Sequence, residues 1–405
     1  MNQCRNCKNK IEPFMNFGKM PIANGFLSKE QFSDEYYFDL LPAFCESCCL
    51  FQIINQPDPE KMFHHHYAFF SRSSKKMIEH FQKYSEWILN NYIDNSDPFV
   101  IELGSNDGIM LENFSIKSIN HLGIEPSANV ANVAREHGVN TLTEFFDKSI
   151  LDNILNEYGY ADVITAANVM CHIPDLNSVA ENINKILKPD GVLIFEDPYL
   201  GSMIEKTSFD QIYDEHVYIF SAISVENIFS PHGFELINII EQNTHGGSMR
   251  YVLARKGQRK IHDVVNNQID YEKRLGLDKP STYNNFRLNC EKNRNDLVLL
   301  LKKIKSEGLS IAGYAATSKS TTVLNYCGIG ADLIEYISDT TPIKQGKYSP
   351  GVHIPIKSHD YFLENKPDYA ILFAWNHMNE IMLNEVEYTK SGGKWILFVP
   401  SVMVE

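Results

Sequence analysis

Two pairs of cysteines near the N-terminus have the spacing of metal ligands. Cys4 and Cys7 form one Cys-x-x-Cys pair, and Cys45 and Cys48 form the second. Each such turn directs two sulfurs at one point, and four thiolates suit a tetrahedral zinc ion. A site with four sulfurs has no open coordination position, so we expect a structural zinc ion and not a catalytic one. Cys49 lies beside Cys48 and is a candidate to replace it.

A second group of reactive side chains is the run Tyr213-Asp214-Glu215-His216. Histidine suits proton removal near neutral pH, because its unperturbed pKa is about 6.5. A carbon beside a ketone can lose a proton to such a base, and a tyrosine hydroxyl can donate a hydrogen bond to the resulting oxyanion. Glu215 is placed to orient or tune the histidine. The alternative interpretation is that these residues are helix-surface polar groups and core aromatics.

Two further candidates for a reaction centre lie elsewhere. His172 follows a predicted strand in VMCHIPD, and Tyr67 follows three histidines in HHHYAFFS. The histidine run at 64–66 indicates a solvated loop more than a metal site.

The segment Phe99–Met110 (FVIELGSNDGIM) predicts a strand, a glycine loop and the start of a helix. Its glycines permit a tight turn and close approach of a ligand to the backbone. Glu125 ends the next predicted strand, where a carboxylate can accept both hydroxyls of a ribose. The loop begins with an acid, Glu102, and lacks a full G-x-G-x-x-G motif, which favours S-adenosylmethionine as the bound cofactor. A dinucleotide is the alternative ligand. The candidate cofactor residues are Glu102, Gly104, Ser105, Asn106, Asp107, Gly108, Glu125, Ala167 and Asn168.

These residues require a sheet whose strand ends are polar. The strand-like runs FVIELG, HLGIEP, ADVITAANV and GVLIFEDP alternate with helical stretches, which is typical of a doubly wound α/β sheet. INIIEQNTHGGSMRYVLAR predicts two strands joined through a Gly-Gly turn. Residues 262–307 predict helices, and LSIAGYAA, LIEYISDT, YAILFAW and KWILFVP predict a second α/β series. We therefore expect three domains, at residues 1–66, 67–260 and 261–405.

Length and charge limit the class of protein. A chain of 405 residues is long enough for two or three domains, and its net charge of -14 argues against coating nucleic acid or an anionic membrane. No apolar run reaches the roughly 18 residues of a membrane span, and the polar N-terminus lacks a signal-peptide segment. We expect a cytoplasmic monomer.

Taken together, the motifs resemble those of the sugar C-methyltransferases of deoxysugar biosynthesis, over essentially the whole chain. They occur in the order expected of that family: CRNC, FGKMPIANGFL, CESC, ELGSNDG, YDEH followed by YIFS, HGGSMR and KQGKYSPGVHIP. The resemblance implies a small zinc-binding head, a central class I methyltransferase domain of Rossmann-like fold and a C-terminal Rossmann-like α/β domain.

The resemblance also implies a reaction. A base removes the proton beside the 4-keto group of a nucleotide-linked deoxysugar, and the enolate carbon, usually carbon 3, takes the methyl group of S-adenosylmethionine. It assigns the base to His216, with Tyr213 and Glu215 as neighbours and His172 and Tyr67 as further active-site positions. The choice between His216 and His172 is left open. Asp214 departs from the histidine common in the family.

The C-terminal domain is expected to help hold the nucleotide-sugar, which is dTDP-, GDP- or CDP-linked. Thr317, Ser318 and Lys319 open a predicted helix, whose N-terminus can bind an anion. The candidate substrate residues are His245, Arg250, Thr317, Ser318, Lys319, Asp339 and Lys344. For Lys344 the alternative is ordinary surface charge. For His245 and Arg250 the alternative is a turn without a binding role.

Other functions fit parts of the pattern. An O- or N-methyltransferase would keep the cofactor loop but would need no carbon base. A nicotinamide-dependent nucleotide-sugar oxidoreductase would use the C-terminal unit, whose loop is poor in glycine. An inactive zinc-containing scaffold would not need an intact Glu-His pair.

Overall fold

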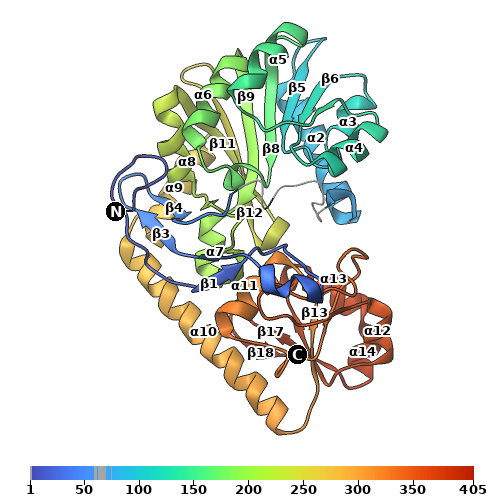
Figure 1. The fold of residues 1–405 in the computed structure, drawn as a ribbon. Helices are drawn as coiled ribbons and strands as arrows, with labels where there is room; N and C mark the ends of the chain where they lie inside the picture. The colour runs from blue at the N-terminus through green and yellow to red at the C-terminus, as the bar shows by residue number, and fades with distance from the viewer. Residues whose placement is uncertain (1, 59–61, 63–69, 74) are drawn as a thin grey trace.

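A seven-stranded sheet, in the upper part of the molecule in Figure 1, forms the unit from the middle of the chain, with the order β11-β12-β9-β8-β5-β6-β7. The computed structural model describes residues 2–58, 62, 70–73 and 75–405. Strands β5 to β9 run parallel, and β12 is antiparallel to both of its neighbours. The bounds are β5 Phe99–Leu103, β6 Asn120–Ile124, β7 Thr141–Leu142, β8 Ala161–Ala167, β9 Leu187–Pro198, β11 Phe234–Gln242 and β12 Ser248–Arg255.

Helices cover both faces of this sheet, which explains why its strands are apolar runs without alternation. Val100 of β5 packs in one cluster with Tyr84 of α2, whereas its neighbour Ile101 packs in another with Ile183 of α6. The parallel strands all end at one edge, so the loops that carry the candidate residues meet there. The helices are α2 Lys75–Tyr92, α3 Glu112–Ser115, α4 Ala128–Glu136, α5 Leu151–Glu157, α6 Leu176–Ile186, α7 Leu200–Lys206 and α8 Ala222–Phe229.

The N-terminal segment forms two small sheets beside the central unit. One pairs β1 (Lys19–Pro21) with β2 (Tyr37–Asp39), and the other has the order β10-β4-β3. Strands β3 and β4 come from the head, at Pro42–Cys45 and Leu50–Ile53, but β10 (Tyr218–Ile219) follows His216 by two residues. The head is thus joined by backbone hydrogen bonds to the segment that carries the candidate base.

The C-terminal unit is introduced by α9 (Asp263–Leu275) and the 27-residue α10 (Pro280–Ser306), which runs along one side of the molecule in Figure 1. Its six strands have the order β15-β14-β13-β16-β17-β18, all parallel except the last. The other bounds are β13 Ile311–Tyr314, β14 Ile337–Ser338, β15 Ile356–Lys357, β16 Tyr369–Leu372, β17 Lys394–Leu397, β18 Met403–Val404, α11 Ser318–Cys327, α12 His359–Glu364, α13 Met378–Asn384 and α14 Val386–Lys390.

The predicted α/β class, with a cysteine-rich head and a second α/β unit, is confirmed. The sequence did not predict the two-residue strands β7, β10, β15 and β18, because strands of two residues are too short to show a periodicity. Among the described residues, no helix combines the length and apolar character needed to span a bilayer. The domain boundaries, the monomeric state and the cytoplasmic location stay predictions.

Candidate active site and zinc centre

The four predicted zinc ligands lie together in the head. Their sulfur atoms are all within 4.8 Å of one another, with Cys4 to Cys48 at 3.6 Å and Cys7 to Cys45 at 3.4 Å. Sulfurs about 2.3 Å from a tetrahedral zinc ion are roughly 3.8 Å apart, so the cluster fits the metal. Hydrogen bonds among the thiols lower the pKa of Cys4 and raise that of Cys48, so full ionisation of the cluster needs a cation.

Neighbouring residues support this arrangement. Gln52 Nε2 donates to the Cys4 sulfur at 3.2 Å, which the sequence did not indicate. Cys49 has a positive φ of 53°, and its sulfur lies 4.0 Å from the carbonyl of Glu46. The cluster therefore uses Cys48, and Cys49 lies outside it.

The glycine loop after β5 has the conformation that its sequence predicts. Gly104 and Gly108 have φ of +62° and +74°, and Asn106 between them has φ of 48°. A Cβ on Gly104 would lie 2.4 Å from Val169, so a larger residue does not fit there.

Carboxylates and a hydroxyl surround this loop. Glu125 accepts the backbone N–H of Asn106 at 3.0 Å and that of Ser127 at 2.8 Å, and burial raises its pKa. Glu102 Oε2 and Ser105 Oγ are buried and have no hydrogen-bond partner among the residues that the structure describes. Carboxylate and hydroxyl groups near the carboxyl ends of parallel strands are suited to bind the amino acid and ribose groups of S-adenosylmethionine.

A segment that the sequence did not single out contacts the loop. Arg72 donates its backbone N–H to Asp107 Oδ2 at 2.8 Å, and its guanidinium pairs with Glu112 at 2.6 Å. Ser71 N donates to Asn106 Oδ1 at 3.1 Å. Tyr67 precedes this segment but lies outside the described residues.

The end of β8 connects to the turn between β11 and β12. Asn168 follows Ala167 and has a φ of 57°, and its amide donates to His245 Nε2 at 2.7 Å. His245 therefore carries its proton on Nδ1, and burial, with the nearby charge of Lys319, lowers its pKa to about 3. Lys319 Nζ donates to the His245 carbonyl at 3.3 Å. The His-Gly-Gly segment is thus a turn that also lines the junction between the two α/β units.

His216 is buried with both ring nitrogens engaged. Nδ1 lies 2.7 Å from the carbonyl of Gln211, which can only accept, so Nδ1 carries the proton. Nε2 accepts the hydroxyl of Tyr213 at 2.8 Å. Burial lowers the pKa of His216 well below its usual value, so the ring is neutral near pH 7 and Nε2 is its basic atom.

His172 lies against this base. The two imidazoles stack with centroids 5.5 Å apart and planes 24° from parallel, and burial lowers the pKa of His172 to about 4. Ligand-type atoms of Cys171, His172 and His216 lie within 4.8 Å of one another. Nearly parallel rings and the engaged nitrogens of His216 suit a shared metal ion poorly.

The acids beside the base are buried, so the interpretation as surface polar groups is wrong. Asp214 and Glu215 are 1% and 4% exposed. Burial raises the pKa of Glu215 to about 7, and burial together with the charge of Glu215 raises that of Asp214.

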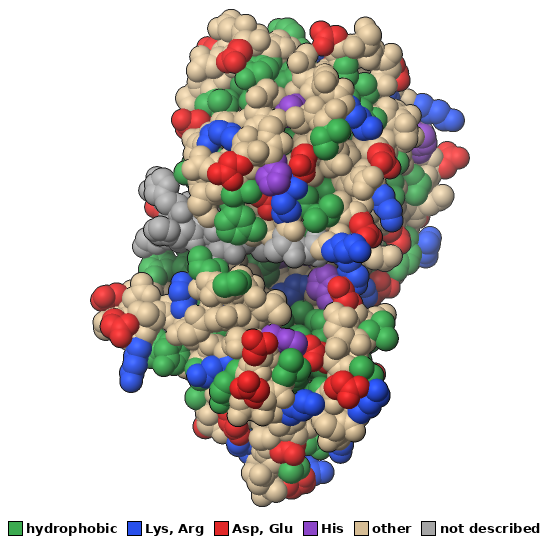
Figure 2. Space-filling model, turned by 90° about the vertical axis from the view of Figure 1, so that its right-hand side faces the viewer, with side chains coloured by type: hydrophobic (Ala, Val, Ile, Leu, Met, Phe, Trp, Pro, Cys, Tyr) green, Lys and Arg blue, Asp and Glu red, His purple; other side chains and the backbone are tan. Residues whose placement is uncertain are grey.

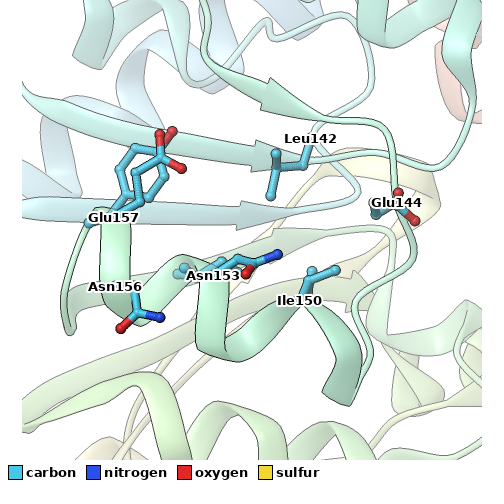
Figure 3. Close-up of a pocket in the computed structure, with 8 residues that line it drawn as sticks. Leu142, Glu144, Ile150, Asn153, Asn156 and Glu157 are labelled. Atoms are coloured by element: carbon cyan, nitrogen blue, oxygen red, sulfur yellow. The ribbon is translucent and has the colours of Figure 1, made fainter.

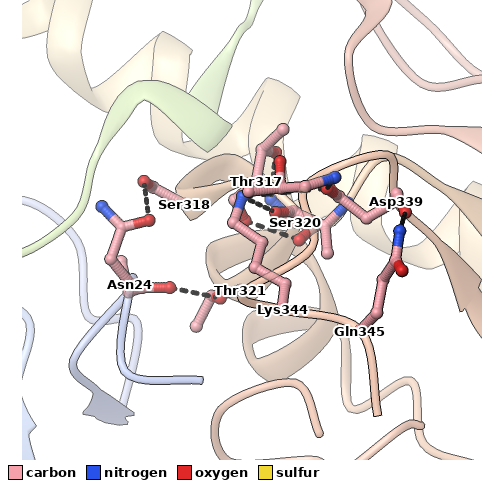
Figure 4. A network of polar contacts seen from close by, with 11 residues as sticks. Asn24, Thr317, Ser318, Ser320, Thr321, Asp339, Lys344 and Gln345 are labelled. Atoms are coloured by element: carbon pink, nitrogen blue, oxygen red, sulfur yellow. Dashed lines mark hydrogen bonds and ion pairs between the residues drawn. The ribbon is translucent and has the colours of Figure 1, made fainter. Parts of the chain in front are cut away.

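The C-terminal candidates lie at the start of α11 (Figure 4). Thr317 caps the helix by accepting the N–H of Ser320 at 3.1 Å. Asp339 accepts the N–H groups of Ala316 and Thr341, each at 2.7 Å, so it holds its own loops. Lys344, whose side chain is 14% exposed, donates to the Ala316 carbonyl at 2.8 Å and lies 3.8 Å from Asp339, so it is not an unpaired surface charge.

Figure 2 shows the surface drawn in where the central and C-terminal units meet, with basic and histidine side chains at this junction. Lys319 of α11, only 8% exposed, reaches from the C-terminal unit to the carbonyl of His245 in the central unit. Burial lowers its pKa, partly offset by the carboxylate of Asp210.

Arg250 is engaged away from such a role. Its guanidinium pairs with Glu196 at 2.8 Å and stacks over the ring of Tyr84 at 3.4 Å. Glu196 also binds His80 of α2 at 2.9 Å. Burial opposes ionisation of Glu196, but these two partners outweigh it and lower its pKa to about 2. The contacts make Arg250 a structural neighbour of the site, and direct substrate binding by it stays a prediction.

A separate surface hollow of about 470 Å³ lies between β7 and α5, lined by Leu142, Glu144 and Ile150 among others (Figure 3). Neither His216 nor the glycine loop lines it.

Comparisons with known proteins agree with this architecture. Family models match at residues 4–63 (putative zinc binding domain), 64–239 (methyltransferase domain) and 243–400 (C-methyltransferase C-terminal domain). The C-methyltransferase NovU of Streptomyces niveus is 30% identical over 407 residues, covering 100% of this chain and 97% of NovU.

More distant similarities cover only part of the chain. A ubiquinone biosynthesis O-methyltransferase of Actinobacillus pleuropneumoniae is 32% identical over 102 residues, 24% of this chain and 44% of that protein. A magnesium protoporphyrin IX methyltransferase of Synechocystis, solved with bound SAM, is 12% identical with a TM-score of 0.34, covering 44% of this chain and 79% of that one. The full-length match to NovU, with the three domain matches in order, is the decisive one. The chain therefore belongs to the S-adenosylmethionine-dependent C-methyltransferases that carry a zinc-binding domain.

Proposed function

We propose that the protein methylates carbon 3 of a nucleotide-linked 4-keto-deoxysugar, with His216 as the general base. The observation that carries the proposal is the state of the imidazole. Its Nδ1 proton is fixed by the Gln211 carbonyl, and its neutral Nε2 faces a tyrosine hydroxyl. A neutral, oriented imidazole is what removal of a proton beside a ketone requires.

His216 Nε2 takes the proton from carbon 3, the electron pair of that C–H bond forms a double bond between carbons 3 and 4, and the π pair of the C=O bond moves to the keto oxygen. Tyr213 turns its hydroxyl from Nε2 to this oxygen and stabilises the enolate. When bound, S-adenosylmethionine supplies an electrophilic methyl group. The enolate carbon would accept this methyl group, with the electron pair of the C–S bond going to sulfur, and the cofactor would leave as S-adenosylhomocysteine. His216 afterwards returns its proton to water.

In this proposal the cofactor binds at the central sheet, and the diphosphate of the substrate binds at the C-terminal unit. Glu125 and Asn168, with the loop from Glu102 to Gly108, hold the cofactor at the carboxyl ends of the central strands. Lys319 and the start of α11 hold the diphosphate, because a buried ammonium and a helix N-terminus both favour an anion. Lys344 and Asp339 support that loop through its backbone.

Exchange of the α proton tests the base directly. A nucleotide-linked 4-keto-6-deoxysugar is incubated in heavy water with S-adenosylhomocysteine, and deuterium at carbon 3 is followed by mass spectrometry. His216→Ala should slow exchange by about 10²-fold or more. His262→Ala, which changes an exposed histidine just before α9 whose side chain makes no capping hydrogen bond, should leave exchange unchanged.

Other outcomes overturn the proposal in distinct ways. Loss of exchange in His172→Ala but not in His216→Ala assigns the base to His172. Methyl transfer to a hydroxyl or amine without any carbon exchange identifies an O- or N-methyltransferase. No reaction with dTDP-, GDP- or CDP-linked sugars excludes this substrate class.

A further inference from the structure

Asn24 lies where the three parts of the chain meet, and no role has so far been given to it. Its Nδ2 donates to Glu215 Oε1 at 2.7 Å. Its Oδ1 accepts the hydroxyl of Ser318, at the start of α11, at 2.9 Å (Figure 4). One amide from the zinc-binding head thus joins the segment of the candidate base to the C-terminal unit.

The residue before it makes a parallel pair of contacts. The N–H of Ala23 donates to Asp214 Oδ1 at 3.0 Å, and its carbonyl accepts the hydroxyl of Thr321 at 2.8 Å. Thr322 also donates to the carbonyl of Ile212 at 3.0 Å. The segment before His216 is therefore held from two sides.

These contacts fix the orientation of the Asn24 amide. With Oδ1 toward the Ser318 hydroxyl, the NH₂ group faces the Glu215 carboxyl group. The flipped amide would set its oxygen against a carboxylate oxygen, which is repulsive when Glu215 is ionised. The ionised carboxylate therefore selects the NH₂ end of the amide, and Ser318 supports this orientation by donating its hydroxyl to Oδ1.

The hydrogen bond that Asn24 donates to Glu215 favours a negative charge on Glu215. Asp214 and Glu215 are consecutive buried acids, so burial and mutual repulsion oppose ionisation of both. The hydrogen bond from Asn24 lowers the pKa of Glu215 against the larger effect of burial. Among the described residues, the titratable groups that interact with Glu215 include Asp214 and Cys171, with His216 next in the chain, and no described cation is among the causes of its pKa shift.

We propose that Asn24 is a positioning residue of the active site: its amide, oriented by Ser318, keeps Glu215 as the ionised acid beside His216. The contact of the head with the C-terminal unit thereby affects the charge of Glu215 beside His216. The inference rests on the methyl transfer proposed above for its catalytic consequence, but not for its effect on Glu215.

The first test needs no substrate. Glutamate carboxyl groups are labelled with ¹³C in the zinc-loaded full chain, and the Glu215 signal is assigned by its loss in Glu215→Gln. Asn24→Ala should move the titration of Glu215 upward by about one to two pH units, because a hydrogen bond to a charged group is lost. Asn24→Asp should move it further, and Ser318→Ala less.

Matched controls separate this effect from misfolding. Asn55→Ala removes an exposed head amide that donates to the Asp39 carbonyl, and should leave the titration unchanged. Zinc content and melting temperature report whether each variant folds. Ser318→Ala leaves Asn24 itself in place, so it tests the idea even if Asn24→Ala does not fold.

The second test is the pH dependence of methyl transfer. The acidic limb of kcat should shift upward in Asn24→Ala with the Glu215 titration, while KM for S-adenosylmethionine stays within about twofold. An unshifted Glu215 titration in folded Asn24→Ala and Ser318→Ala overturns the inference. A shifted titration in a protein that methylates no keto sugar leaves the inference standing and overturns only the proposed function.

Discussion

Loss of zinc should abolish proton removal by His216, the proposed base, but should leave binding of the cofactor nearly unchanged. The path is short: β4 begins two residues after Cys48, and it pairs with β10, which begins two residues after His216. Ile53 N also donates to the Val217 carbonyl at 2.9 Å. The glycine loop follows β5 of the seven-stranded sheet, and none of the described strands of that sheet comes from the head. Cys48→Ser removes one thiolate and is the sharpest way to break the centre.

The size of the effect follows from what the metal and the strands contribute. Structural zinc sites contribute roughly 10–16 kcal/mol at pH 7. The described contact between β4 and β10 rests on a few backbone hydrogen bonds, about 1 kcal/mol each, and on buried Leu50, Phe51 and Ile53 at about 1.5–3 kcal/mol each. The metal term is at least as large as this contact, so without zinc β4 should no longer hold the segment of His216.

The assay combines metal content with two functions. Purified Cys48→Ser should contain no zinc by atomic emission and should lose carbon exchange and methyl transfer by about 10²-fold or more. Binding of S-adenosylhomocysteine by calorimetry should weaken by less than about threefold. Cys49→Ser is the matched control, because its sulfur lies outside the cluster, and it should keep one zinc ion and full activity.

Two results would refute this reasoning. A Cys48→Ser protein that retains one zinc ion would show that Cys49 replaces the lost ligand. A zinc-free Cys48→Ser protein with normal carbon exchange would show that β10 needs no support from the head.

The cofactor site and a buried ion pair give two more tests. Glu125→Gln should weaken S-adenosylhomocysteine by about tenfold or more, because a charged acceptor for the ribose becomes a neutral one; an unchanged Kd in calorimetry would place the ribose elsewhere. Glu196→Gln should destabilise the fold by about 3 kcal/mol in urea unfolding, since it leaves Arg250 buried without its anion. The pKa of Glu196 is lowered to about 2, so its stabilisation is present above about pH 4.3 and is lost as pH falls toward 2; equal stability of wild type and variant at pH 7 would contradict this.

Much of the site could be predicted from local patterns. The two Cys-x-x-Cys pairs indicate their own ligand set, because two turns of fixed spacing leave few other arrangements for four sulfurs. The loop Gly104–Gly108 and Glu125 could be predicted because glycine is favoured where φ is positive, and because an acid at the end of the next strand lies beside the loop.

Other features have no local signal. Asn24 and Glu215 are 191 positions apart, and Asn24 and Ser318 are 294 apart, so nothing in the neighbouring residues indicates that they meet. Gln211 holds His216 through its backbone carbonyl, which any residue would supply. Arg250, expected to be a substrate residue, pairs with Glu196 because β12 and β9 run side by side.

The sequence by itself determined the zinc ligands, the α/β class and the turn of the glycine loop, because each depends on short-range spacing, on apolar runs or on glycine. Only the tertiary structure decided which nitrogen of His216 carries the proton, the burial of Asp214 and Glu215, and the contacts of Asn24. The physical reason is that a pKa and a hydrogen-bond partner depend on which groups exclude water from a site, and those groups come from all three parts of the chain.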